Sequence, residues 1–160
     1  MTMIISAHLG DCILIASDKR SMHCDLETGN MRLATDEEQK IKLWCRGAIA
    51  GSGETVFLNR IAQHFMDIQE DETQLNQMDV IYEEIEKRVL EDIPQKILSR
   101  NVIIFSMFEN KKTVLYSIPI EPFFQTFQED DVYKIHPYMN EITEWAVNVS
   151  CFNIPPDMSN

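Results

Sequence analysis

The chain has 160 residues, of which 44% are hydrophobic and 25% are charged, and its formal net charge is −12 at pH 7. This composition is typical of a soluble globular protein, and the length suits a single domain spanning residues 1–160 with a core of its own. The excess of acidic residues argues against a nucleic-acid partner, because phosphate contacts need clustered Lys and Arg.

A hairpin is predicted at the start of the chain. Apolar or small residues occupy positions 3–7 and 12–17, and Gly10-Asp11 between them is a hairpin-turn signal. The second run reads Cys-Ile-Leu-Ile-Ala-Ser and is almost continuously apolar, which predicts a strand buried on both faces.

A polar stretch separates this hairpin from the next strands. It runs from residue 18 to residue 32 and carries a turn signal at 28–30. Further strands are predicted at 40–44 and 48–50, and Arg46-Gly47 turns the chain between them.

The segment Gly51-Ser52-Gly53-Glu54 ends these strands and opens a helix. Ser52 or Gly53 is expected to cap the helix, and Glu54 is favourable in the first turn, where its negative charge meets the positive end of the helix dipole. The apolar residues keep to helical spacing on one face: Val56, Phe57, Ile61, Phe65 and Ile68.

A second helical pattern runs from about residue 76 to residue 99. Pro94 inside it predicts a kink or an early end, because proline has no backbone N–H to donate. The apolar stripe of this pattern consists of Val80, Ile81, Ile85, Val89, Leu90, Ile93 and Ile97.

The pattern returns to strands after the helices. Runs at 102–108 and 113–118 flank the polar segment 109–112, which predicts a hairpin. The remaining predicted elements are a strand pair at 123–127 and 132–136, a short helix at 141–147 and a loose tail at 155–156. Strands, two helices and strands again indicate an α+β fold built in layers.

The cysteines give no sign of a metal site or a disulfide framework. Cys12, Cys24, Cys45 and Cys151 form no Cys-x-x-Cys pair, and disulfide frameworks belong mainly to shorter secreted chains. We interpret them as reduced thiols, mostly buried as small hydrophobic residues, and we assign no metal to the adjacent His23 and Cys24. No cofactor is predicted.

The sequence also indicates no membrane partner. No apolar run approaches the roughly 18 residues that a spanning helix needs. The first residues, Met-Thr-Met-Ile-Ile-Ser-Ala-His, lack the basic leader of a secretory signal. We therefore expect a cytoplasmic protein.

Runs of acidic residues are spread along the chain. We interpret them as solvated surface and loops. The alternative is a polyanion mimic that occupies a basic site on another protein. The runs are Asp36-Glu37-Glu38, Glu70-Asp71-Glu72, Glu83-Glu84 and Glu129-Asp130-Asp131.

Three features of the first hundred residues occur in a characteristic order. Thr2 begins a short strand, and Asp18-Lys19-Arg20 follows the second strand. Lys40 precedes a strand that leads through Ala50-Gly51 into a long helix. In this order and spacing they resemble the proteasome β-subunit family and its bacterial relative, the HslV-type peptidases. Each motif alone is weak, and together they are moderately specific.

The resemblance covers 2–21 without a gap and continues from residue 40 to about residue 99, well over half of the chain. It implies an N-terminal-nucleophile hydrolase fold. That fold is an αββα sandwich with two long central helices, here shortened or altered at its C-terminal end.

The resemblance implies a catalytic role for four residues. Once Met1 is removed, Thr2 would supply the nucleophilic hydroxyl and also the base, because a free α-amine has a reference pKa of about 7.7–8.0. Lys40 would lie beside the hydroxyl and favour the alkoxide, and Asp18 would pair with Lys40. The backbone N–H of Gly51 would stabilise the oxyanion. The reaction implied is hydrolysis of an amide bond through an acyl-threonine ester.

The chain departs from the family pattern at several points. The segment between Asp18 and Lys40 is longer than the family usually has, which leaves Lys42 as a competitor of Lys40. Met22 stands where the family prefers a small hydroxylated residue. The last glycine is Gly53, so the later Gly-Ser-Gly turn that supports the nucleophile in the family is absent.

The short C-terminal half must also solve a structural problem. Sheets without their last strands expose edges, which we expect to be covered by residues 119–160, by a partner subunit or by a changed topology. We interpret the aromatic residues there as core, and the alternative is a subunit interface. They are Phe123, Phe124, Phe127, Tyr133, Tyr138, Trp145 and Phe152.

Two functional interpretations therefore stand side by side. The first is a threonine peptidase or amidase that acts on a peptide or protein substrate. The second is a catalytically inactive proteasome-fold protein that serves as a binding or regulatory subunit. The resemblance implies a homo-oligomer, and whether the chain is an enzyme stays open at this point.

Overall fold

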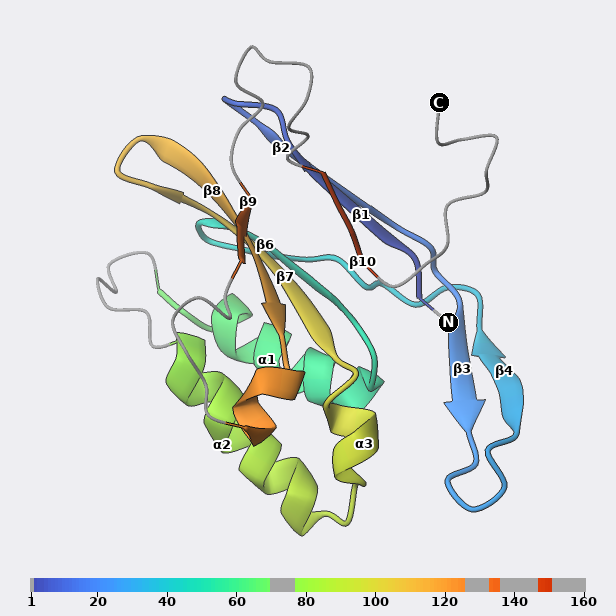
Figure 1. Cartoon of the computed structure of the whole chain (residues 1–160). Coiled ribbons are helices and arrows are strands. Elements are labelled where there is room, and N and C mark those ends of the chain that lie inside the picture. The colour runs from blue at the N-terminus through green and yellow to red at the C-terminus, as the bar shows by residue number, and fades with distance from the viewer. Residues whose placement is uncertain (1, 70–76, 126–132, 136–146, 151–160) are drawn as a thin grey trace.

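Figure 1 shows the computed structural model of the chain, a mixed fold of sheets and a few helices. The structure describes residues 2–69 and 77–125 and the two strands at 133–135 and 147–150. In chain order the elements are β1 (Ile4–His8), β2 (Ile13–Ser17), β3 (Ser21–Cys24), β4 (Met31–Thr35), β5 (Lys42–Trp44), β6 (Gly47–Ser52), α1 (Thr55–Met66), α2 (Gln77–Leu90), α3 (Gln95–Leu98), β7 (Val102–Glu109), β8 (Lys112–Pro119), the 3-10 helix η1 (Glu121–Phe124), β9 (Tyr133–Ile135) and β10 (Val147–Ser150).

The larger sheet lies between two other layers (Figure 1). Its strand order is β5-β6-β7-β8-β9, and successive residues of β7 point to opposite faces. Ile103 and Phe105 pack with the buried residues of α1 and α2. Ile104 packs instead with Ile4 of β1 and Leu115 of β8. The described chain is therefore layered as helices, five-stranded sheet and three-stranded sheet.

The predicted N-terminal hairpin is confirmed as β1 and β2, which pair antiparallel with Ile4 opposite Ser17. The expectation that the second strand is buried on both faces is wrong. Leu14 is 49% exposed and Ala16 is also exposed, while Ile15 between them is half-buried. β2 is the last strand of the sheet β10-β1-β2, and only its inner side chains reach the five-stranded sheet.

The tip of this hairpin is fastened to the larger sheet by buried His8. Its Nε2 lies 3.0 Å from the carbonyl oxygen of Thr113 at the start of β8, and its Nδ1 accepts a hydrogen bond from the Gly10 N–H. The Thr113 hydroxyl in turn donates to the Gly10 carbonyl. These contacts hold the two sheets in one relative position at this end.

The stretch expected to be polar from residue 18 to residue 32 contains an additional hairpin. β3 and β4 pair only with each other among the described strands, around the turn that the sequence signalled. His23 and Arg32 lie opposite each other on one face. The other face is apolar and carries Met22, Cys24, Met31 and Leu33.

The central strands follow the sequence prediction closely. β5 and β6 form a hairpin, and β7 and β8 form a longer one. Asn110 and Lys111 at its turn have positive φ angles of 50° and 61°, as a two-residue turn between twisted strands requires.

The first helix is confirmed, but its cap is a different residue from those expected. The Glu54 carboxylate accepts hydrogen bonds from the N–H groups of Val56 and Phe57, so Glu54 is the N-cap in place of Ser52 or Gly53. Phe57, with the later apolar residues of the stripe, is buried, whereas Val56 is exposed on the other side of the helix.

The second helical segment ends early, as Pro94 predicted. α2 stops at Leu90, Asp92 adopts a positive φ of 61°, and Pro94 caps the short α3. The predicted apolar stripe is wrong at its C-terminal end, because Val89 is exposed and Leu90 is 84% exposed. Two buried, ion-paired residues of α2, Glu84 and Arg88, occupy part of the face that the apolar stripe was expected to fill.

The C-terminal segment supplies one edge strand to each of these two sheets. β9 pairs with β8, and β10 pairs with β1, with Ile4 opposite Ser150. The strand predicted at 132–136 is therefore confirmed, but its predicted partner at 123–127 is wrong. Residues 121–124 form η1, with Pro122 in its first turn, and Phe123 is buried. The predicted helix at 141–147 and tail at 155–156 fall outside the described residues, except that Val147 begins β10.

None of the helices in the described part of the chain has both the length and the apolar character that a membrane crossing requires. Among the described residues, Cys12, Cys24 and Cys45 are free thiols. The expectation that the cysteines are mostly buried is wrong for these three, because each of them is exposed.

Candidate active site

Thr2, Asp18 and Lys40 meet at the start of β1. The Lys40 ammonium donates a hydrogen bond of 3.3 Å to the Thr2 hydroxyl oxygen and one of 2.9 Å to Oδ1 of Asp18. The Lys40 side chain is only 8% exposed, and that of Asp18 is 27% exposed. The structure therefore brings together three of the four residues singled out in the sequence, although 38 positions separate Thr2 from Lys40.

Asp18 holds both this lysine and the backbone beside Thr2. Its Oδ1 accepts a hydrogen bond of 2.7 Å from the Met3 N–H, and its Oδ2 accepts one from the Arg20 N–H. Burial raises the pKa of the Asp18 carboxyl. The Met3 N–H, the Lys40 ammonium and the Arg20 N–H outweigh this effect and set the pKa below its ordinary value. Asp18 is thus held as a carboxylate.

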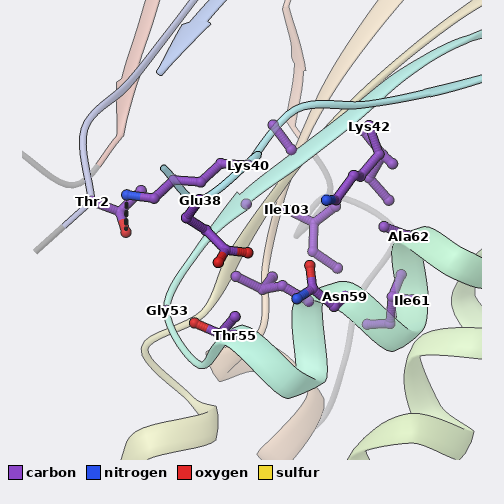
Figure 2. Close-up of a pocket in the computed structure, with 14 residues that line it drawn as sticks. Thr2, Glu38, Lys40, Lys42, Gly53, Thr55, Asn59, Ile61, Ala62 and Ile103 are labelled. Atoms are coloured by element: carbon purple, nitrogen blue, oxygen red, sulfur yellow. Dashed lines mark hydrogen bonds between the residues drawn. The ribbon is translucent and has the colours of Figure 1, made fainter. Parts of the chain in front are cut away.

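The structure also distinguishes the two competing lysines. Lys40 and Lys42 both line one small pocket, in keeping with their separation by two positions near a strand. Lys40 reaches Thr2, while Figure 2 shows the Lys42 side chain lying further along the pocket, toward Ile103 and away from Thr2.

Gly51, the fourth residue, lies in the wall of the same pocket as Thr2. A Cβ at this position would come within 2.5 Å of Leu58 Cδ2, so glycine lets the α1 side chain pack directly on β6. The pocket holds about 30 Å³ of open volume, which is room for about two water molecules at the ~10–15 Å³ that one requires. Glu38 and Lys42 extend into it as flexible side chains (Figure 2).

A buried asparagine shapes the corner that carries Gly51 into α1. The Asn101 side-chain oxygen accepts a hydrogen bond from the Glu54 N–H. Gly53 has a φ of 133°, and a Cβ there would lie 2.2 Å from that same oxygen. The corner therefore needs glycine at position 53 for two independent reasons, the positive φ and the close approach.

Some pocket residues were not singled out in the sequence. Glu38 belongs to an acidic run that was interpreted as solvated surface, yet it lines the pocket. Asn59 and Thr55 come from the first turns of α1 (Figure 2). Thr55 and Asn59 reach the pocket because the turn at Gly53, between β6 and α1, directs the helix back along β6. Among the described residues, no group of three or more His, Cys, Asp and Glu side chains is placed to hold a metal ion.

Comparison with known proteins gives a distant structural likeness. No protein-family model matches the chain, and no curated protein matches its sequence. Fourteen solved chains match, and one of them is the Anbu (Gly-1) mutant from Hyphomicrobium sp. strain MC1. That comparison has a TM-score of 0.44 and an identity of 18%, and it covers 86% of this chain and 60% of the Anbu chain. The chain thus spans less than two thirds of that protein, and a likeness at this level establishes neither family nor activity.

Proposed function

We propose that this chain is a proteasome-like N-terminal threonine hydrolase that cleaves a peptide or amide bond through an acyl-Thr2 ester. One observation carries the proposal. The Lys40 ammonium lies 3.3 Å from the Thr2 hydroxyl, and a buried contact with Asp18 holds it there. A hydroxyl is a weak nucleophile unless a nearby base or cation activates it. Thr2 is the described hydroxyl for which this arrangement and a pocket coincide.

Acylation begins once Thr2 is the first residue of the chain. Its α-amine takes the proton of the hydroxyl, and Oγ1 attacks the substrate carbonyl carbon, so that a C–O bond forms. The Lys40 ammonium stabilises the alkoxide as it develops. The backbone N–H of Gly51 is the proposed donor to the carbonyl oxygen when that oxygen becomes negative.

Collapse of the tetrahedral intermediate breaks the substrate C–N bond. The leaving amine receives the proton that the α-amine of Thr2 took up, and the acyl group stays on Oγ1 as an ester. In the second half, a water molecule gives a proton to the same α-amine, and its oxygen attacks the ester. The carboxylic acid then leaves, and Oγ1 recovers its proton.

The wider proposal is that the protein is a member of the proteasome β-subunit and HslV-type family and forms homo-oligomers. The three described layers match one helix layer and both sheets of the αββα sandwich. The inactive binding or regulatory subunit is the alternative outcome of the experiment below.

The mass of the native protein is the first test, because a retained Met1 ties up the α-amine of Thr2 in a peptide bond. The second test is reaction with a peptide epoxyketone, whose ring closure on the protein requires both the hydroxyl and the free amine of one residue. We expect loss of Met1 and a single adduct on Thr2. The Thr2→Ala variant should form none.

Two lysines of the same pocket provide a matched pair of variants. Lys40→Met should slow adduct formation by about 100-fold or more, the usual effect of removing one group that stabilises developing negative charge. Lys42→Met should slow it by less than about threefold, since Lys42 does not contact Thr2. Retention of Met1, or equal labelling of the native protein and Thr2→Ala, would falsify the hydrolase and favour the inactive subunit.

A further inference from the structure

A second hollow lies beside the candidate active site and shares no lining residue with the pocket. It is a groove of about 680 Å³ between the start of β1, the segment after β2 and the β3–β4 hairpin. Met3, Met22 and Met31 line it. Methionine side chains are flexible and polarisable, so they adapt to apolar partners of different shapes.

The groove and the pocket lie at opposite ends of the ion pair between Asp18 and Lys40. Asp18 lines the groove, whereas Lys40 and Thr2 line the pocket. The 2.9 Å contact between Asp18 and Lys40 therefore stands between the two hollows. A molecule whose reacting atom sits at the Thr2 hydroxyl has the pocket on one side, and the groove begins at Asp18 and at Met3, the residue next to Thr2.

The charges of the groove are largely neutralised within the protein. Asp18 is paired with Lys40, and Arg20 is paired with Asp36 at 2.6 Å. Lys19 is the remaining charged residue of the lining and is exposed, so the methionines make up the apolar part of the groove that stays partly open to solvent. Met31 is 53% exposed and Met3 is 45% exposed.

The hairpin that forms one wall also needs an apolar partner. An isolated pair of strands is marginally stable in water, and the apolar face of β3 and β4 leaves Leu33 as exposed as Met31, at 53% each. A peptide bound in the groove would bury Met22 and Met31 of this face and would stabilise the hairpin against β1.

We infer that the groove binds the leaving-group half of the substrate and selects an apolar residue directly after the scissile bond. The inference rests on the proposed hydrolase and deepens it. With the acyl half directed toward the pocket, the amine half must extend away from it. Of the three side chains of the candidate active site, Asp18 lines the groove, so the groove is the neighbouring hollow on that side.

The experiment uses a pool of randomised decapeptides, in which mass spectrometry reads the cleaved bonds. With the native protein, Leu, Met and Phe directly after the cleaved bond should exceed Ser by about tenfold, the discrimination that burial of one apolar side chain supplies. Met31→Ser should reduce this ratio to about threefold or less.

Leu33→Ser is the matched control, because Leu33 has the same exposure on the same hairpin face but does not line the groove. This variant should keep the tenfold ratio. The peptide epoxyketone has no leaving-group half, so it should label Thr2 at the same rate in all three proteins.

The possible outcomes separate the inference from the proposed function. Normal labelling of Thr2 with no apolar preference overturns the inference and leaves the hydrolase standing. Equal effects of Met31→Ser and Leu33→Ser, accompanied by a change in oligomer mass, also overturn it, because the face is then a contact between copies of the chain. Absence of labelling in the native protein overturns both.

Discussion

The side-chain oxygen of Asn101 accepts a hydrogen bond of 2.7 Å from the backbone N–H of Glu54, although 47 residues separate them in the chain. Asn101 is fully buried, and its amide group donates to the carbonyls of Ile97 and Leu98 in α3. This one side chain therefore fastens the corner between β6 and α1, where Gly51 lies, to the end of α3.

Replacing Asn101 with Ala should lower the free energy of unfolding by about 1–3 kcal/mol, because the part-buried Glu54 N–H loses its acceptor. Urea unfolding followed by circular dichroism measures the change. Asn59→Ala, an exposed site on α1, should stay within about 0.5 kcal/mol of the native protein. Equal effects of the two variants would contradict the role given to Asn101.

The Gly53→Ala variant tests the same corner from the other side. It should be destabilised by more than about 1 kcal/mol, since alanine must adopt a left-handed backbone and meet the Asn101 oxygen. Combined with Asn101→Ala, part of that clash disappears, so the double variant should be more stable than the sum of the single effects by at least about 0.5 kcal/mol. Strict additivity in urea unfolding would show that the two residues do not interact.

Ion pairs between α1 and α2 differ in how deeply they are buried. Arg88, 9% exposed, contacts both Glu54 and Glu91, whereas Arg60, 41% exposed, contacts Glu84 and Glu91. Removing one partner from a buried pair leaves a charge without compensation, so Arg88→Met should cost about 3–5 kcal/mol. The control is Arg20→Met, which removes one partner of the exposed Arg20–Asp36 pair, with side chains 61% and 53% exposed, and should cost less than about 1 kcal/mol. Thermal and urea unfolding should rank the two variants in this order, and the reverse order would contradict the assignment.

The pH dependence of stability should report on Asp18. Its pKa is lower in the folded protein than in the unfolded chain, so its contribution is present above the unfolded value of about 3.9 and is lost as the pH falls through the folded value. Asp18→Asn should therefore destabilise the protein at pH 7, and the gap to the native protein should shrink between about pH 4 and pH 2. Urea unfolding at several pH values measures the gap, and a gap independent of pH would rule out this role.

Local pattern was sufficient for much of the fold. The β7–β8 hairpin was predictable because two mainly apolar runs flank a polar turn, which adopts positive φ at Asn110 and Lys111. Pro94 likewise indicated the end of α2. The β3–β4 hairpin was missed because Arg32 and His23 make it read as polar, while its apolar face is not packed as a core strand would be.

Long-range pairing accounts for what the sequence could not supply. Glu84 and Arg88 are buried because they find ionic partners on α1, which no periodicity reveals. The choice between Lys40 and Lys42 depended on a contact with Thr2 across 38 positions of the chain. The meeting of Thr2, Asp18 and Lys40 was foreseen only through the family resemblance, and their catalytic roles remain predictions.

The pairing of β10 with β1 has a consequence for the order of events during synthesis. β1 begins two residues after Thr2, and Ile4 has Ser17 on one side and Ser150 on the other. At 5–20 residues per second, translation reaches the second partner on the order of ten seconds after the first strand has left the ribosome. Until then one edge of β1 is open to other chains. The strand that positions the candidate nucleophile is thus among the first to be made and the last to be enclosed.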